Sequence, residues 1–397
     1  MICRPSAARA AAAVLLLSVL LAGSAHAQTP IVVAEHLSFP AGIAFDSAGT
    51  MFVTERPGRI LAFEGPGAPR AVASVPTTTT GESGLLGIAV LPDDRWVYAF
   101  GTELDGSNTI WRVKTEGGRP QRVVAGLPGG TYHNGGGVAF GSDGMLYVSN
   151  GEIHASDRAQ DPTVLGGKVY RYTPEGDIPD DNPFGDAAAF AIGLRNPFGL
   201  AIDPVTGAPF VTENGPSSFD EINRIVAGGN YGWPTFSGPA GGETGALEGS
   251  YQDPIAAYEE SIVPTGIAFA DPANARRSVA GDLFFAAYGD QTIHQVRLNE
   301  ARDEVVEDSV MFESPEPIVA VAWGPRGLYF STPGAVMLLP LARDLPAHGT
   351  DSTGDEGGGT DSLPASSTPT ALLIFGAAGA ILLGALLYAF GKRRGRT

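Results

Sequence analysis

Cysteine is almost absent from this sequence. The chain of 397 residues has one cysteine, Cys3, near the N-terminus. Basic residues and then the apolar run Ala10–Leu21 follow it, and small residues flank a cleavage position after Ala27. This pattern predicts a secretory signal peptide over residues 1–27. The mature chain, from Gln28, then lacks cysteine, which excludes disulfides and cysteine-ligated zinc.

Positive charge is also scarce. The sequence has 25 Lys and Arg against 43 Asp and Glu, which gives a formal net charge of −18. An acidic surface repels nucleic acid and anionic membranes, so we expect neither to bind the body of the protein. Solubility is the simplest explanation of this charge.

Long apolar runs are confined to the two ends of the chain. Besides the signal peptide, the segment 371–391 is uncharged and almost wholly apolar, and the basic tail 392–397 follows it directly. About 20 such residues span a bilayer, and a basic flank favours the cytoplasmic side. We therefore predict a C-terminal transmembrane helix over 371–391, with the body of the protein outside the cytoplasm.

The segment that precedes this helix has few large apolar residues. Residues 344–370 are rich in Gly, Ser, Thr, Asp and Pro, a composition that cannot bury enough surface to fold, so we predict a flexible stalk. Leu363–Ser367 is similar to a sortase signal, but Ser stands where Thr and Gly are expected. We favour a retained membrane anchor at the cell surface, and cell-wall linkage is the alternative.

What the chain has in abundance is a short repeat. Between residues 28 and 343, a motif of Gly, an apolar residue, Ala and a bulky apolar residue recurs, each time followed by a turn and two further β runs. A period of roughly 45 to 65 residues with these turn signals predicts a β-propeller of four-stranded blades. The copies begin at Gly42, Gly87, Gly137, Gly199, Gly266 and, without the glycine, Ala320.

The first and last repeats indicate how the ring closes. Six copies imply six blades in one all-β domain, residues 28–343. No outer strand follows Leu339, whereas Ile31–Glu35 precedes the first inner strand and has the pattern of an outer strand. We expect the N-terminal strand to complete the last blade, which removes an exposed edge.

Loops on this scaffold carry the functional signal. Gly193–Pro234 contains an Arg-Asn pair, Gly-Pro turns and several carboxylates. Together with Gly84–Gly87, His133–Gly136, Gly167–Val169 and Ile178–Pro183, it resembles the soluble quinoprotein glucose dehydrogenases and aldose sugar dehydrogenases, also called the glucose/sorbosone dehydrogenase family. The resemblance covers about the whole propeller.

The resemblance implies a reaction. In this family pyrroloquinoline quinone (PQQ) lies over the central channel with a calcium ion, and the anomeric carbon of an aldose gives hydride to the quinone, leaving a lactone. His133 falls at the position of the general base, and Glu152 at that of the carboxylate that orients it. Imidazole suits proton removal because its pKa lies near working pH. The alternative for His133 is a loop histidine with ordinary hydrogen bonds.

The resemblance also implies ligands for the cofactor and for calcium. Arg195 and Asn196 match the cofactor-binding pair, and a guanidinium suits a tricarboxylate; Glu82 occupies the place of a polar residue near the cofactor. The carbonyls of Gly215 and Pro216 match the ligands of the catalytic calcium. A neighbouring structural calcium site is matched by Asp220, Glu221 and Tyr231. The alternatives are an arginine that caps a turn and a solvated acidic loop.

Several residues depart from the family pattern. Tyr288 stands where a Lys or Arg of the fifth blade is expected, and Pro317 and Val319 stand where basic residues enter the sixth inner strand. Gly137 and Tyr132 replace an Arg and an Asp beside the histidine motif. Loss of about three charge-assisted contacts, at roughly 1.5–3 kcal/mol each, weakens binding of an anionic cofactor by several kcal/mol.

Two functions therefore remain open. The first is an extracytoplasmic, PQQ- and calcium-dependent aldose dehydrogenase with a sugar substrate and an unnamed electron acceptor. The second is a non-catalytic surface propeller that binds a glycan or a protein. Retention of His133, Glu152 and Arg195 favours the enzyme, and loss of the blade-five and blade-six cations favours the binding module. A hydrolase or lactonase would need calcium held in the channel by several blades, and no such set stands out.

Overall fold

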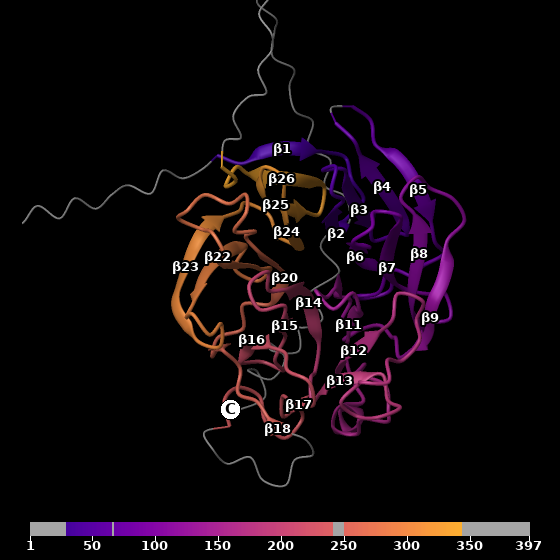
Figure 1. The fold of residues 1–397 in the computed structure, drawn as a ribbon, viewed down its shortest axis with the longest axis vertical. Helices are drawn as coiled ribbons and strands as arrows, with labels where there is room; N and C mark the ends of the chain where they lie inside the picture. The colour runs from indigo at the N-terminus through magenta and orange to yellow at the C-terminus, as the bar shows by residue number, and fades with distance from the viewer. Residues whose placement is uncertain (1–28, 66, 241–249, 344–397) are drawn as a thin grey trace, which may run out of the picture.

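The computed structural model describes residues 29–65, 67–240 and 250–343. They form 26 β-strands and one short 3-10 helix, η1 (Ser156–Gln160), and the strands surround a central axis (Figure 1). The predicted signal peptide, stalk, transmembrane helix and basic tail lie outside the described residues. Among the residues that are described, no helix is long and apolar enough to cross a membrane.

The strands pair into six sheets. Five of these sheets have four strands, as expected for propeller blades. The first two sheets comprise β2 (Pro40–Phe45), β3 (Met51–Glu55), β4 (Arg59–Phe63) and β5 (Arg70–Ser74), then β6 (Leu85–Val90), β7 (Trp96–Thr102), β8 (Asn108–Lys114) and β9 (Gln121–Leu127). Two further sheets comprise β14 (Pro197–Ile202), β15 (Pro209–Glu213), β16 (Asp220–Arg224) and β19 (Ala256–Tyr258), then β20 (Pro264–Phe269), β21 (Leu283–Ala287), β22 (Thr292–Leu298) and β23 (Val305–Glu313).

The last four-stranded sheet joins the two ends of the described chain. It comprises β24 (Ala320–Gly324), β25 (Gly327–Thr332), β26 (Ala335–Leu339) and β1 (Ile31–Ala34). Strand β1 pairs antiparallel with β26, with Ile31 opposite Leu338, and Figure 1 shows the two side by side. The prediction that the N-terminal strand closes the ring is confirmed.

One sheet departs from the four-stranded prediction. It comprises β10 (Val138–Phe140), β11 (Leu146–Asn150), β12 (Lys168–Tyr172) and β13 (Ala189–Ile192), extended by the short parallel strands β17 (Gly229–Asn230) and β18 (Ser250–Tyr251). The chain that leaves β16 crosses to this sheet before it returns to its own sheet at β19. As a result the amide of Trp233 donates to the carbonyl of Gly193 at 2.9 Å.

The repeat motif is explained by packing at the centre of the ring. The inner strands contact one another in the order β2, β6, β10, β14, β20, β24 and back to β2. Their glycines allow this approach, because a Cβ on Gly42 would lie 2.6 Å from the carbonyl oxygen of Leu86, and one on Gly266 would lie 2.7 Å from the Cα of Ala320. The all-β propeller prediction is confirmed.

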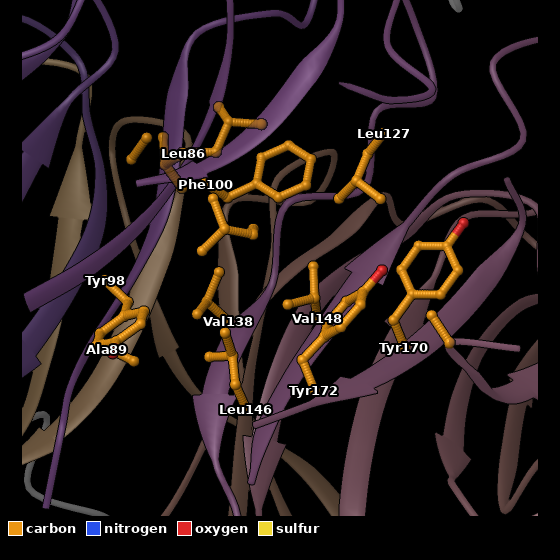
Figure 2. Close-up of a cluster of buried hydrophobic side chains, with 14 residues drawn as sticks. Leu86, Ala89, Tyr98, Phe100, Leu127, Val138, Leu146, Val148, Tyr170 and Tyr172 are labelled. Carbon is orange, nitrogen blue, oxygen red and sulfur yellow. The ribbon is translucent and has the colours of Figure 1, made fainter. Parts of the chain in front are cut away.

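The hydrophobic core lies between neighbouring sheets rather than in the central channel. Figure 2 shows one cluster in which Phe100 and Tyr98 of β7 pack near Val148 of β11 and Tyr170 of β12. Tyr98 and Tyr170 are fully buried. Burial of a large apolar side chain contributes roughly 1.5–3 kcal/mol, so these contacts hold adjacent blades in register and fix the loops at their ends.

Candidate functional site at the mouth of the channel

The predicted site residues lie at one face of the ring. Glu82, His133 and Arg195 precede the inner strands β6, β10 and β14, while Glu152 and Gly215 follow the second strands β11 and β15. In an antiparallel pair, the start of one strand and the end of the next meet at the same edge. We call this face, formed by the loops before inner strands and after second strands, the mouth face.

His133 and Glu152 form a close pair. Nδ1 of His133 lies 2.5 Å from Oε1 of Glu152, and the two residues are 7% and 2% exposed. His133 has a φ of 57°, in the left-handed region that non-glycine residues seldom occupy. Such backbone strain concentrates at functional sites. The amide of His133 donates to Oε2 of Glu82 at 2.9 Å, so Glu82 holds the loop that carries His133.

The electrostatics of the pair favour an ionised Glu152 beside His133. Burial opposes ionisation of Glu152, but the hydrogen bond and charge of His133 and the charge of Arg195 outweigh it, and the pKa of Glu152 is lowered. An ionised carboxylate accepts hydrogen bonds only, so Nδ1 of His133 carries the proton. The other ring nitrogen, Nε2, is then the one that can accept a proton.

The backbone amides of Arg195 and Asn196 share one partner, whereas their side chains make different contacts. The carboxylate of Glu213 accepts hydrogen bonds from the amides of both residues, at 3.1 and 2.6 Å. Oδ1 of Asn196 accepts a hydrogen bond from the amide of Gly135 at 3.0 Å, so Asn196 braces the histidine loop. The Arg195 guanidinium lies over the ring of Trp233, with 5.5 Å between its Cζ and the ring centroid.

The predicted ligands of the catalytic calcium lie next to this guanidinium. Nη1 of Arg195 donates to the carbonyl oxygens of Asn214 and Gly215, at 2.8 and 3.1 Å. Pro216 follows in the same loop between β15 and β16. The carbonyl of Gly215 therefore lies at the mouth face, where it accepts a hydrogen bond from the Arg195 guanidinium.

The three predicted structural-calcium residues do not act alike. Oδ1 of the fully buried Asp220 accepts the amide of Gly215 at 2.8 Å, and Oδ2 accepts the amides of Ile262 and Val263, each at 2.8 Å. Asp220 therefore ties two loops together through donors of the protein. The hydroxyl of Tyr231 donates to the carbonyl of Arg224 at 2.6 Å.

Glu221 faces a carboxylate that the sequence reasoning missed. Glu213 lies opposite Glu221 in the register of β15 and β16, which places both side chains on one face of the sheet. Burial and then the charge of Glu221 raise the pKa of Glu213 to about 8, and burial also raises the pKa of Glu221. Glu213 stands two residues before the predicted calcium loop, and that position was the available signal.

One cavity brings these groups together. It is lined by Arg195, Glu213, Gly215, Glu221 and Tyr231, with Trp233 at its side. Two carboxylates and loop carbonyls are the oxygen donors that calcium prefers, and a divalent cation would neutralise the two acids. The donor types therefore fit a calcium ion, with Glu213 as an additional candidate ligand. The carboxylates of Glu213 and Glu221 also accept hydrogen bonds from the protein, as that of Asp220 does.

A second residue missed by the sequence reasoning is His154. Its ring centroid lies 4.0 Å from that of His133, and its side chain is exposed. Partial desolvation of the imidazole, and then the charge of the nearby His133, lower the pKa of His154. Its place two residues after Glu152 in the sequence was the signal that could have revealed it.

The far side of the mouth face is apolar. Tyr288 and the buried Val319, which stand where cations are expected, pack into one hydrophobic cluster with Ala41 and Phe39. Arg56 is the cation nearby, because its charge interacts with both Tyr288 and Glu82. Its Nε and Nη2 donate to the carbonyls of Ser83 and Thr79, each at 2.8 Å, so these donors are already used within the protein.

The central channel itself carries no charged lining within the described ranges. Glycine, alanine and aliphatic residues of the six inner strands, with Phe198, surround it. Such a lining offers no side-chain oxygen for a metal.

Comparison with known proteins gives the family. Residues 37–336 match the family model described as Glucose / Sorbosone dehydrogenase. The chain belongs to this family. The predicted resemblance is confirmed, and the glucose/sorbosone dehydrogenases are by their name oxidoreductases.

Individual members of the family are moderately similar to the chain. Aldose sugar dehydrogenase YliI of Escherichia coli is 30% identical over 332 residues, covering 75% of this chain and 88% of that protein. Quinoprotein glucose dehydrogenase B of Acinetobacter calcoaceticus is 32% identical over 251 residues, 52% of each chain. The PQQ-bound aldose sugar dehydrogenase of Streptomyces coelicolor matches with a TM-score of 0.67 and 30% identity, over 78% of this chain and 97% of that one.

Proposed function

We propose that this protein is a PQQ- and calcium-dependent dehydrogenase that oxidises the anomeric carbon of an aldose to a lactone. The observation that carries the proposal is the buried His133–Glu152 pair, 2.5 Å apart, on the mouth face of a glucose/sorbosone dehydrogenase propeller. Names of similar proteins support a sugar as substrate and PQQ as cofactor. Calcium is supported by the oxygen donors of the cavity.

His133 supplies the base for this chemistry. Glu152 holds Nδ1 protonated, which leaves Nε2 free of a proton and able to accept one from a sugar hydroxyl. The positive charge that forms on the ring is stabilised by the Glu152 carboxylate. The hydride acceptor for the anomeric carbon would be supplied by PQQ when it is bound.

The cavity beside His133 supplies the cofactor and metal contacts. Arg195 offers the guanidinium that an anionic quinone needs, and the stack on Trp233 limits its motion. Glu213, Glu221 and the carbonyl of Gly215 would hold calcium. Nη1 of Arg195 donates to the Gly215 carbonyl, so the residues that would hold the cofactor and those that would hold calcium are neighbours.

The setting of the reaction belongs to the same proposal. The signal peptide and C-terminal helix predicted from the sequence support a propeller outside the cytoplasm, anchored at the cell surface. Electrons from the sugar then leave through a membrane-bound or soluble carrier. The strongly acidic composition, with a net charge of −18, agrees with a small neutral substrate rather than a polyanion.

A non-catalytic binding propeller is the second candidate. It is favoured by the apolar side of the mouth face, where Tyr288 and Val319 replace expected cations, and by the Arg195 guanidinium, which is already bonded to Asn214 and Gly215. Such a protein would keep the propeller and bind a glycan through the same loops.

Sugar-dependent dye reduction separates the two candidates. The full chain, reconstituted with PQQ and calcium, is assayed against a panel of aldoses, and the product is analysed for the lactone. We expect turnover that requires sugar, PQQ and calcium together. A folded protein without turnover on any aldose would rule out the dehydrogenase and leave the binding propeller.

A further inference from the structure

A cluster of metal-ligating side chains lies beside the calcium cavity. His133, Glu152 and His154 each offer one ligand atom, and these atoms all lie within 4.8 Å of one another. His133 and Glu152 are buried, whereas His154 is exposed. The cluster therefore has a buried inner part and one side open to solvent.

Glu152 carries an oxygen that lacks a partner. Oε1 of Glu152 contacts His133, but Oε2 is buried and has no hydrogen-bond partner among the described residues. Leaving a charged oxygen buried and unsatisfied has a free-energy cost. A cation bound within the cluster would remove this cost.

The backbone holds the two histidines against each other. The amide of Ile153 donates to the carbonyl of His133 at 3.3 Å, and a Cβ on Gly151 would collide with the same carbonyl oxygen. His133, Ile153 and His154 all have positive φ values, 57°, 52° and 60°. The imidazoles are thus placed close together by the fold, at a centroid distance of 4.0 Å.

The donor set selects the class of metal. Two imidazoles and one carboxylate are the protein ligands of catalytic zinc sites, which keep a fourth position open for water or substrate. Imidazole favours Zn²⁺, Cu²⁺ and Ni²⁺, whereas calcium prefers oxygen. Zinc bonds of about 2.0–2.2 Å place tetrahedral ligand atoms about 3.4 Å apart. The ligand atoms of the cluster lie within 4.8 Å of one another, and rotation of the exposed His154 side chain can bring its ring nitrogen to the distance that zinc requires.

We propose that His133, Glu152 and His154 form a binding site for a divalent transition metal, with Zn²⁺ as its representative ion. The site is separate from the oxygen-lined cavity of Glu213 and Glu221. A metal on His133 competes with the sugar hydroxyl proton for the imidazole, so occupancy inhibits the reaction. This last clause rests on the proposed dehydrogenase function; the binding of metal does not.

The binding experiment uses the full chain without PQQ. Zn²⁺ is titrated by calorimetry and Co²⁺ by visible absorption, both in excess calcium so that oxygen sites are filled. We expect one high-affinity ion per chain, tetrahedral Co²⁺ bands, and at least tenfold weaker binding in His154→Ala and in Glu152→Gln. Circular dichroism checks that each variant is folded.

A matched control is available on an outer strand. His294 in β22 also pairs with a carboxylate, with Nδ1 2.8 Å from Oδ1 of Asp308, but it lies outside the cluster. His294→Ala should bind Zn²⁺ like the wild type. Absence of binding to the wild type, or equal binding in His154→Ala, would overturn the proposed site.

The inhibition clause has its own test. Sugar-dependent dye reduction is measured against Zn²⁺ concentration, with calcium in excess, in wild type and His154→Ala. We expect the inhibitory concentration to rise at least tenfold in the variant. Equal inhibition of both proteins would overturn the clause. If the wild type shows no turnover without Zn²⁺, the dehydrogenase fails while the binding titration still decides the metal site.

Discussion

The two sides of the mouth face differ in chemistry. On one side, His133, Glu152 and Arg195 form a polar cluster next to a cavity lined by two buried acids. On the other side, Tyr288 and Val319 continue the hydrophobic core. Under the proposed function, the polar side would supply proton transfer and metal binding, while the side expected to hold the cofactor's negative charge lacks the expected cations. The predictions below test this contrast.

The largest effect is expected at His133. His133→Ala removes the base of the polar side, and general-base catalysis contributes about 10²–10⁴-fold. We expect kcat to fall by at least about 100-fold in dye-reduction assays, with the affinity for PQQ little changed. His294→Ala, on an outer strand, is the control and should keep wild-type turnover. A His133→Ala protein with wild-type kcat would contradict the assignment of His133 as the general base.

The next effect is expected at Arg195. A charge-assisted hydrogen bond contributes about 1.5–3 kcal/mol, so Arg195→Ala should weaken PQQ binding by roughly 10- to 100-fold in calorimetry. Arg195→Lys keeps the charge but loses the two-pronged geometry, so its affinity for PQQ should lie between those of the wild type and Arg195→Ala. Arg56→Lys is less informative, because its guanidinium already serves loop carbonyls. Unchanged affinity in Arg195→Ala would place the cofactor elsewhere.

Restoring a cation on the apolar side should strengthen cofactor binding. Tyr288→Lys introduces a charge at a half-buried position close to Arg56. We expect roughly tenfold tighter PQQ binding, about 1.4 kcal/mol, since a new charge-assisted contact is partly offset by repulsion from Arg56. Tyr288→Phe is the matched control and should bind like the wild type. No gain in Tyr288→Lys, in a folded protein, would show that the apolar side does not face the cofactor.

The smallest effect concerns pH. The pKa of Glu213 is raised to about 8 in the folded chain without metal, above its unfolded value, so the folded state binds the extra proton. Stability of the metal-free protein should therefore fall as pH rises from about 4.5 to 8. Calcium should raise Tm more at pH 8 than at pH 5, and Glu213→Gln should flatten the pH dependence of Tm in metal-free buffer. Thermal scans in calcium and in chelator measure both; a pH-independent wild type would contradict the buried acid pair.

The repeat made much of the fold predictable. Inner-strand glycines such as Gly42 and Gly266 recur because neighbouring strands approach too closely for a side chain, and this constraint is visible in the sequence. Closure by Ile31–Ala34 was predictable from the absence of an outer strand after Leu339. The parallel addition of β17 to β13 was not, because it depends on two-residue contacts between distant loops.

The main residues of the candidate site were predictable from the sequence, but the residues that contact them were not. His133 and Glu152 were identified through the resemblance to the family, and the structure brings them together. Glu213 was missed because its importance comes from facing Glu221 across a strand pair, and His154 because a left-handed turn places its ring on His133. The role of Asp220 as a calcium ligand stays a prediction; the contacts that the sequence did not reveal are the hydrogen bonds that its oxygens accept from three backbone amides.

Calorimetric titration of the full-length wild type with PQQ in calcium tests the central claim most directly. The account predicts saturable binding of one PQQ per chain in the micromolar range or tighter, lost when calcium is removed, and accompanied by sugar-dependent turnover. A folded protein that releases no heat with PQQ would contradict the account, and the polar side of the mouth face would then serve a binding propeller.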